Sequence, residues 1–227
     1  MKCAIIMAGG KGTRMKSNGP KVMCEVLFEP MISHVVKTVK EMGAEDICVI
    51  TGYEHEIVES FLADMDSSVK TVLQNPQLGT GHAVMQARDF ITAHKDDDII
   101  VLNGDGPLID AETLNKAYDY HKENNNSITL ISAIVEDTNG IGHIKRDENG
   151  KLERIIEHKD ATEEEKKNLN ESNAGFYWFN GNDLLYALDN ITNNNAQNEY
   201  YITDSVAILI AAGKNACLLY TSDAADE

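Results

Sequence analysis

The chain has 227 residues, of which 42% are hydrophobic, and its formal net charge is −17 at pH 7. This length and composition predict one globular domain, and the acidic charge argues against a broad surface for nucleic acid or for an anionic membrane. No apolar run has membrane-spanning length, and charged Lys2 followed by a glycine-rich loop is unlike a signal peptide, so we expect a cytoplasmic protein whose partners are metabolites. The four cysteines lack paired spacing and indicate buried thiols rather than disulfides or metal ligands.

A short apolar run at residues 4–7 leads directly into a loop rich in glycine and in cationic side chains. The run predicts a buried first strand, and glycines without a Cβ let backbone N–H groups approach a ligand. Successive N–H groups make an anion-binding concavity, to which the cations add charge. An ordinary strand-to-helix turn is the alternative, and neither standard phosphate fingerprint is present, but three cations in so acidic a chain favour phosphate. The residues are Gly9, Gly10, Gly12, Lys11, Arg14 and Lys21.

Strands and helix-period segments alternate through the first two thirds of the chain, which is the pattern of a parallel sheet covered on both faces. We expect strands at 4–7, 47–50, 69–73 and 99–102, with helices at 32–42, 57–62 and 83–91. Beyond residue 127 the pattern favours strands joined by turns, at 128–135, 142–146 and 152–156. A charged surface helix or loop at 159–170, a strand at 175–179 and a closing helix at 201–212 complete the prediction.

Asp105 follows the apolar strand at 99–102 and lies between two glycines. Ligands bind outside the carboxyl ends of the strands in an open α/β sheet, so Asp105 and the glycine loop are expected to face one site. A carboxylate suits a hard cation such as Mg²⁺. From the residue alone, a turn or helix-capping role is the commoner interpretation.

The segment 9–21 resembles the G-x-G-T-R-M…P-K signature of the sugar-1-phosphate nucleotidyltransferases. Segments 78–83, 157–162 and 193–204 resemble more narrowly the uridyltransferase domain of the bifunctional bacterial UDP-N-acetylglucosamine pyrophosphorylases and glucosamine-1-phosphate acetyltransferases. The resemblance covers residues 1 to about 216. It implies a Rossmann-like nucleotide-diphospho-sugar transferase fold of class α/β, with a mostly parallel central sheet flanked by helices and a smaller sugar-binding lobe.

This resemblance implies a transferase that forms UDP-N-acetylglucosamine and pyrophosphate from UTP and N-acetylglucosamine 1-phosphate, with Mg²⁺ as cofactor and a place in cell-wall synthesis. Two alternatives stay open. One is a uridylyl- or thymidylyltransferase for another sugar 1-phosphate, and the other is a catalytically silent module that binds nucleotide sugars. The presence of Lys11, Arg14, Lys21 and Asp105 favours an enzyme.

By the same resemblance, Arg14 and Lys21 are catalytic, with Lys21 reaching the α-phosphate and the incoming phosphate, and Asp105 binds Mg²⁺. His82 is expected to pack at a helix start rather than act as a base, because phosphate oxygens need no deprotonation near neutral pH. The remaining implied site residues bind substrate. They are Met7, Ala8, Gly9, Gly10, Lys11, Gly12, Thr13, Gln74, Gly79, Thr80, Asn103, Gly104, Gly142, Glu157 and Asn173.

Two positions depart from the family pattern. Asn103 stands where a tyrosine lies beside the sugar, and His143 replaces an arginine. Both are therefore candidates for altered substrate affinity.

The last eleven residues, 217–227, do not resemble the family and look like a translated transposase adapter from sequencing-library preparation. We therefore predict a C-terminally truncated nucleotidyltransferase domain at 1–216 and a non-native tail that adds nothing to the fold or its stability, with a genuine acidic terminus as the alternative. The family's second metal ligand, an asparagine, would lie beyond residue 216. This fragment is expected to be a monomer, whereas the full-length family forms trimers through a C-terminal β-helix domain.

Overall fold

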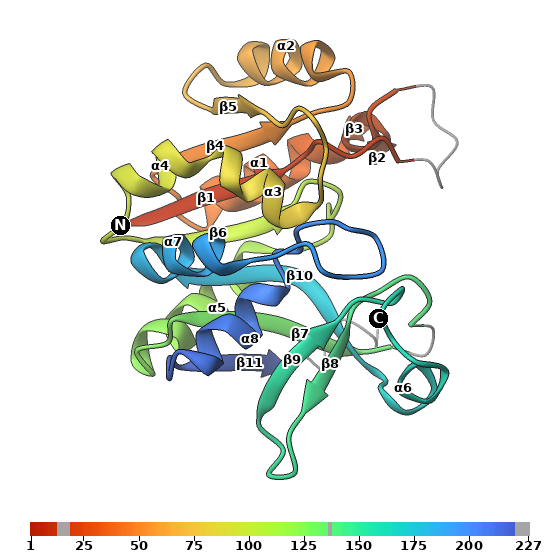
Figure 1. Ribbon diagram of the computed structural model, residues 1–227. Coiled ribbons are helices and arrows are strands. Elements are labelled where there is room, and N and C mark those ends of the chain that lie inside the picture. The colour runs from red at the N-terminus through yellow and green to blue at the C-terminus, as the bar shows by residue number, and fades with distance from the viewer. Residues whose placement is uncertain (13–18, 136–137, 221–227) are drawn as a thin grey trace.

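The main sheet is mixed and has the strand order β11-β7-β10-β6-β1-β4-β5, with β8 and β9 joined to it through β10, whereas β2 and β3 pair separately. A computed structural model describes residues 1–12, 19–135 and 138–220. The pairs β1–β4, β1–β6, β4–β5 and β11–β7 are parallel, whereas β10 runs antiparallel to its neighbours β6 and β7. Helices lie over the sheet, and the β8–β9 hairpin projects from it (Figure 1). The predicted α/β class with a mostly parallel sheet is confirmed.

The first half of the chain alternates strands and helices as the sequence predicts. One difference concerns residues 83–91, where a single helix was expected. Ala87 leaves α-helical geometry, with φ −86° and ψ 18°, and divides the segment into two helices that pack against one core. The elements are β1 (Lys2–Met7), the 3-10 helix η2 (Lys21–Met23), β2 (Glu25–Val26), β3 (Glu29–Pro30), α1 (Met31–Glu41), β4 (Asp46–Thr51), α2 (His55–Met65), β5 (Lys70–Leu73), α3 (Thr80–Gln86), α4 (Arg88–Ala93), β6 (Asp98–Asn103) and α5 (Ala111–Glu123).

The second half holds the expected strands. Two helices had not been placed by the sequence interpretation, α5 at the end of the first half and α7 in the second. The elements are β7 (Ile128–Ile134), β8 (His143–Arg146), β9 (Leu152–Ile156), α6 (Glu163–Asn168), β10 (Glu171–Asn180), α7 (Gly181–Asn190), α8 (Asp204–Ala211) and β11 (Ala216–Tyr220). β10 begins four residues before the predicted strand, and its pairing with β7 shifts register between Asn173 and Tyr177. Within the described ranges, none of the helices has the length and apolarity needed to cross a membrane.

Two hydrophobic cores lie on opposite faces of the sheet because successive strand residues point to opposite sides. Cys3 and Ile5 of β1 belong to the core formed with α3, α4, α7 and α8, and Ala4 and Ile6 belong to the core formed with α1, α2 and α5. The cysteines are free thiols, and the expected burial holds for Cys3 and Cys48, whereas Cys24 and Cys217 are partly exposed. Burial raises the pKa of Cys3 to about 12, so the thiol stays protonated at neutral pH.

The first residues of the supposed tail take part in the sheet, so the expectation that residues 217–227 add nothing to the fold is wrong for 217–220. β11 pairs in parallel with β7, with Ala216 opposite Ile128 and Tyr220 opposite Ser132. Leu218 packs against one core and Leu219 against the other. Because successive apolar side chains pack on opposite faces of the sheet, this segment forms its edge strand, whatever the origin of the segment.

β1 lies at the point where the order of the strands reverses. The chain runs from β1 through α1 to β4 on one side, and β6 returns to the other side of β1. A crevice opens outside the carboxyl ends of two parallel strands at such a point. The glycine loop leaves β1 there, and the segment containing Asp105 leaves β6 there.

Candidate functional site

Two adjoining cavities open at the carboxyl ends of β1 and β6. The first, which we call the Gln74 cavity, has a volume of about 350 Å³ and is lined by the glycine loop, Lys21, Gln74 and the start of α3. The second, the Glu157 cavity, has a volume of about 580 Å³ and is lined by residues around β8, β9 and β10. The residues that line both are Met7, Thr80, Asn103 and Asp105.

The glycine loop folds back onto Lys21. Gly12 has φ +65°, and a Cβ at this position would lie 2.6 Å from the Cβ of Lys21, so glycine is required. The Lys21 side chain forms an ion pair with the Asp105 carboxylate across the crevice. Both side chains are about 30% exposed, at 30% and 28%. Lys21 is therefore directed into the crevice and is not an ordinary surface lysine.

The structure gives the positions of some other residues of the predicted phosphate loop. Gly9 and Gly10 line the Gln74 cavity. The Nζ atom of Lys11 lies 5.0 Å from the centre of the Tyr53 ring, a cation–π contact. Thr13 and Arg14 lie outside the described residues. Of the sequence-predicted cations, the structure thus brings Lys21 to the site and places Lys11 beside an aromatic ring.

Ala8 and Gly104 support the site through their backbones. The Ala8 N–H donates to the Ile50 carbonyl at 2.8 Å, and the Gly104 N–H donates to the Met7 carbonyl at 2.9 Å. A Cβ on Gly104 would lie 3.1 Å from that carbonyl oxygen. The first contact joins the end of β1 to β4, and the second joins it to the segment after β6, so that the glycine loop and the Asp105 segment begin side by side.

Gln74 presents a polar group to the first cavity although its side chain is almost buried. Its backbone N–H donates to the Thr51 carbonyl at 2.9 Å. Its side-chain Nε2 donates to the Gly79 carbonyl at 2.9 Å and faces His82 Nδ1 at 3.2 Å. The carboxamide oxygen is directed toward Gly9, where an added Cβ would lie 3.2 Å from it.

Hydrogen bonds join the start of α3 to the segment before α8. The Gly81 N–H donates to the Tyr200 carbonyl at 2.7 Å, and the Ile202 N–H donates to Thr80 Oγ1 at 3.0 Å. Gly79 has φ +106°, and a Cβ there would lie 2.5 Å from the Tyr200 carbonyl oxygen. Two of the sequence motifs, 78–83 and 193–204, therefore form one interlocked unit at the edge of the Gln74 cavity.

The Glu157 cavity brings together Gly142, Glu157 and Asn173, as the resemblance implied. Glu157 accepts a hydrogen bond from Thr203 Oγ1 at 2.8 Å, and burial raises the pKa of its carboxyl group. Asn173 donates from Nδ2 to the Tyr177 hydroxyl at 2.6 Å. These side chains are held by neighbours before any ligand arrives, which is the property of a preformed polar pocket.

The two positions that depart from the family pattern have different surroundings. Asn103 lines both cavities, and a Cβ on Gly175, which has φ +81°, would lie 2.4 Å from its Nδ2 atom. His143 is fully buried, and its Nδ1 lies 3.1 Å from the Leu169 carbonyl oxygen. Of the two, Asn103 lines the cavities, whereas His143 lines neither of them.

Sequence reasoning missed several residues that line or support these cavities. Gln77 and Glu199 line the Gln74 cavity, and Thr203 and Tyr177 line the Glu157 cavity. Thr203 and Glu199 fall inside the motif at 193–204, which is the one sequence signal that could have found them. Tyr177 lies in an apolar strand, where the sequence predicted only core packing.

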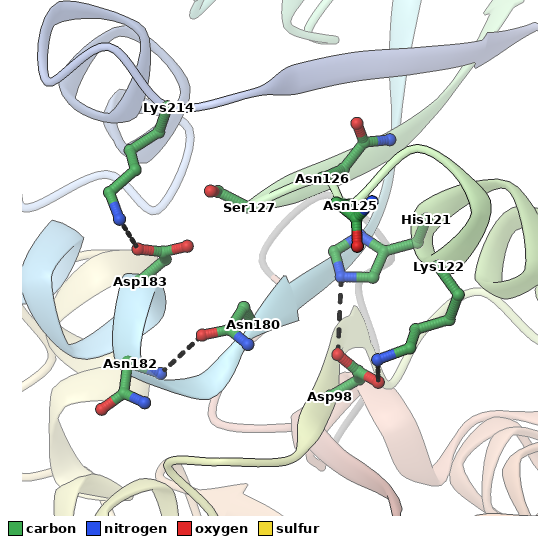
Figure 2. A pocket seen from close by; sticks show the side chains of 10 residues that line it. All are labelled: Asp98, His121, Lys122, Asn125, Asn126, Ser127, Asn180, Asn182, Asp183 and Lys214. Carbon is green, nitrogen blue, oxygen red and sulfur yellow. Dashed lines mark hydrogen bonds and ion pairs between the residues drawn. The ribbon is translucent and has the colours of Figure 1, made fainter.

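A separate polar cavity of about 300 Å³ lies at the opposite ends of the strands (Figure 2). Its charged side chains are already paired, because Lys122 contacts Asp98 at 2.8 Å and Lys214 contacts Asp183 at 2.8 Å. It contains none of the sequence-predicted residues. We therefore take the Gln74 cavity and the Glu157 cavity, which share Asp105, as the candidate site.

Comparisons with known proteins show the family of the chain. The profile of the nucleotidyl transferase family matches residues 3–225. The chain is 49% identical over 204 residues to the Bifunctional protein GlmU of Fervidobacterium nodosum, and 40% identical over 228 residues to that of Acetivibrio thermocellus. These alignments cover 90% and 100% of this chain and 43% and 48% of the relatives, so the chain spans about half their length.

A solved structure of a glucose-1-phosphate thymidylyltransferase from Bacillus anthracis has the same fold. The TM-score is 0.80, and the match covers 98% of this chain and 87% of that chain. The sequences are 24% identical, so this likeness concerns the fold.

Proposed function

The chain belongs to the nucleotidyl transferase family, and from this premise we propose that it transfers a uridylyl group from UTP to N-acetylglucosamine 1-phosphate. The observation that carries the proposal is that the Gln74 cavity and the Glu157 cavity, both lined by polar side chains, meet at Asp105, which forms an ion pair with Lys21. A nucleotide in the first and a sugar phosphate in the second would place their phosphates at this junction. The product, UDP-N-acetylglucosamine, suits a cytoplasmic enzyme of cell-wall synthesis.

The reaction requires little covalent chemistry from the protein. An oxygen of the sugar phosphate bonds to the α-phosphorus of UTP, and the bond from that phosphorus to the oxygen bridging to the β-phosphate breaks, so that pyrophosphate leaves. Positioning and charge stabilisation provide most of the rate enhancement in such transfers. We assign these tasks to the glycine loop and Lys21 for the phosphates, to Gln74 and Thr80 for the base, and to Glu157 and Asn173 for the sugar.

We further propose that Asp105 holds Mg²⁺, which when bound neutralises phosphate charge. A carboxylate within reach of bound phosphates fits a cation that prefers oxygen ligands from one or two carboxylates and from phosphate. Asp105 fits this description, because it lies at the junction of the cavities and already balances the charge of Lys21. Asp105→Asn should therefore abolish Mg²⁺-dependent turnover while metal-free binding of the nucleotide sugar survives. Unchanged metal dependence of that variant would contradict the assignment.

The activity is tested by measuring pyrophosphate release with each pair of nucleotide and sugar phosphate. We expect UTP with N-acetylglucosamine 1-phosphate to give the highest kcat/KM. Faster release of pyrophosphate from dTTP with glucose 1-phosphate would instead favour a thymidylyltransferase, the class of the solved structure that has the same fold. Calorimetric binding of UDP-N-acetylglucosamine without any pyrophosphate release would instead indicate a silent binding module.

A further inference from the structure

We propose that His82 is a positioning residue that fixes the direction of the Gln74 carboxamide and so makes the Gln74 cavity select uracil over cytosine. The inference deepens the proposed function, because it concerns which base that function would accept. It rests on the contacts of the Gln74 and His82 side chains, at the point where β5 leads into α3.

The direction of the Gln74 carboxamide is set by the chemistry of its neighbours. Nε2 donates to the Gly79 carbonyl at 2.9 Å, and a carbonyl oxygen can only accept, so nitrogen rather than oxygen must stand there. The second hydrogen of Nε2 faces His82 Nδ1 at 3.2 Å. With both hydrogens engaged, Oε1 is left on the side of Gly9, which lines the cavity.

An accepting oxygen in that place discriminates between pyrimidines. Uracil carries a hydrogen on N3 and can donate to Gln74 Oε1, whereas N3 of cytosine is itself an acceptor and would repel it. A rotated carboxamide would present its NH₂ group and reverse this preference. With the hydrogen bond to Gly79 alone, the nearly buried Gln74 carboxamide would leave its second N–H without a partner and could rotate. An acceptor on His82 binds this N–H and so prevents the rotation.

His82 can accept only while its ring is neutral, and its surroundings favour the neutral form. Nδ1 accepts from Gln74 in the neutral tautomer that carries its proton on Nε2. Nε2 lies 3.3 Å from Gln86 Nε2, so amide nitrogens face both ring nitrogens, and a second ring proton on Nδ1 would point at a donor. Gln86 is also tied to the His82 carbonyl at 3.0 Å. Burial lowers the pKa of His82, in the same direction. The ring stands beside Tyr200, with the centres 6.2 Å apart, which holds it in the interlocked unit.

The test measures the affinities for UDP and CDP by calorimetry in four single variants. His82→Leu keeps bulk but removes the acceptor, and we expect the ratio of the two affinities to fall about tenfold, the effect of one neutral hydrogen bond. His82→Asn can place Oδ1 where Nδ1 lies and should retain the ratio. Gln86→Ala removes the other neighbour of the ring and should leave the ratio unchanged. Gln74→Ala should lose most of the discrimination.

A double variant separates positioning from packing. If His82 acts through Gln74, His82→Leu should have no further effect on the ratio in a Gln74→Ala background, whereas a purely structural effect would persist there. A tenfold loss that persists, or a folded His82→Leu protein with the wild-type ratio, overturns the inference. Wild-type indifference between UDP and CDP overturns it as well. A clear preference for UDP combined with no turnover of N-acetylglucosamine 1-phosphate counts against the proposed function alone.

Discussion

The role of Lys21 depends on the residues that surround it in the fold. Alone, a lysine in a loop is a surface residue, but the fold-back of Gly12 and the ion pair with Asp105 direct this one into the crevice. Where negative charge shifts between phosphates during the reaction, a fixed cation stabilises the transition state more than the bound substrates. We infer that Lys21 serves the reaction more than the binding of substrate.

Lys21→Ala should therefore lower kcat by about 100- to 1,000-fold, with a smaller change in KM, because the lost interaction strengthens in the transition state. Steady-state kinetics of pyrophosphate release measure both values. Lys37→Ala is a suitable control, since Lys37 is 57% exposed and pairs with Glu29 outside the two cavities. Equal kcat and KM for wild type and Lys21→Ala would show that Lys21 is an ordinary surface lysine with no role in the reaction.

Asp204 illustrates a residue whose charge opposes folding. Burial, together with the nearby carboxylates of Glu157 and Asp160, raises its pKa to about 6. An unfolded aspartate titrates near 3.9. The folded state therefore binds the proton more tightly, and the free energy of unfolding decreases as pH rises from about 4 to about 6.

Asp204→Asn removes this titration. The melting temperature of the variant minus that of the wild type should grow between pH 4 and pH 6 and then level off by pH 7. Thermal melts at several pH values, with both proteins in the same buffers, measure the difference and cancel the other titrating groups. A difference independent of pH would show that Asp204 titrates normally in the folded chain.

Among the elements, the edge strand β11 gives the sharpest prediction. Its residues 217–220 pair with β7 and contribute Leu218 and Leu219 to the two cores. A chain ending at Ala216 should thus lose these pairs and the partial burial of two leucines, each worth up to about 1.5–3 kcal/mol if fully buried. The matched control ends at Tyr220 and retains every described residue of β11. Equal melting temperatures for the two truncated chains would mean that the strand adds nothing to stability.

The elements also show what the sequence could and could not predict. Strands 47–50, 99–102 and 152–156 and the helix around 32–42 were predictable because their apolar periodicity is strong and their ends carry turn residues. The helix α5 was missed because only Leu114, Ala117 and His121 of its thirteen residues are buried, which leaves a weak apolar stripe. β11 was missed because an unfamiliar sequence was interpreted as foreign, whereas an edge position needs only alternating apolar side chains.

The candidate site was predictable to the extent that motifs marked it. Gln74, Glu157 and Asn173 were placed by resemblance, and the structure brings them to two joined cavities. Their supporting contacts, such as Thr203 with Glu157, depend on segments 46 residues apart and leave no local pattern. Periodicity reports which side of an element is buried, but it carries no information on which distant side chain a polar group will meet.

For the whole molecule, the two cavities lie in different parts of the sheet but share one wall. Met7, Asn103 and Asp105 come from the ends of β1 and β6, whereas Glu157 and Asn173 come from the region of β9 and β10. A ligand that occupies both cavities binds both parts at once. Its second half then binds at the high effective concentration set by the first half.

We therefore expect UDP-N-acetylglucosamine to stabilise the folded chain more than its two halves, UMP and N-acetylglucosamine 1-phosphate, supplied together at the same concentrations. At about 100 times its Kd, the nucleotide sugar should add about 2.7 kcal/mol to the free energy of unfolding. For a domain of this size, that gain corresponds to a rise in melting temperature of roughly 5–10 °C. Differential scanning fluorimetry without added metal measures the shift, and UDP-glucose, which lacks the N-acetyl group, serves as the comparison ligand. If the mixture of the two halves raised the melting temperature as much as the joined ligand does, the cavities would be acting as independent sites, and the proposal that they form one bridged active site would be wrong.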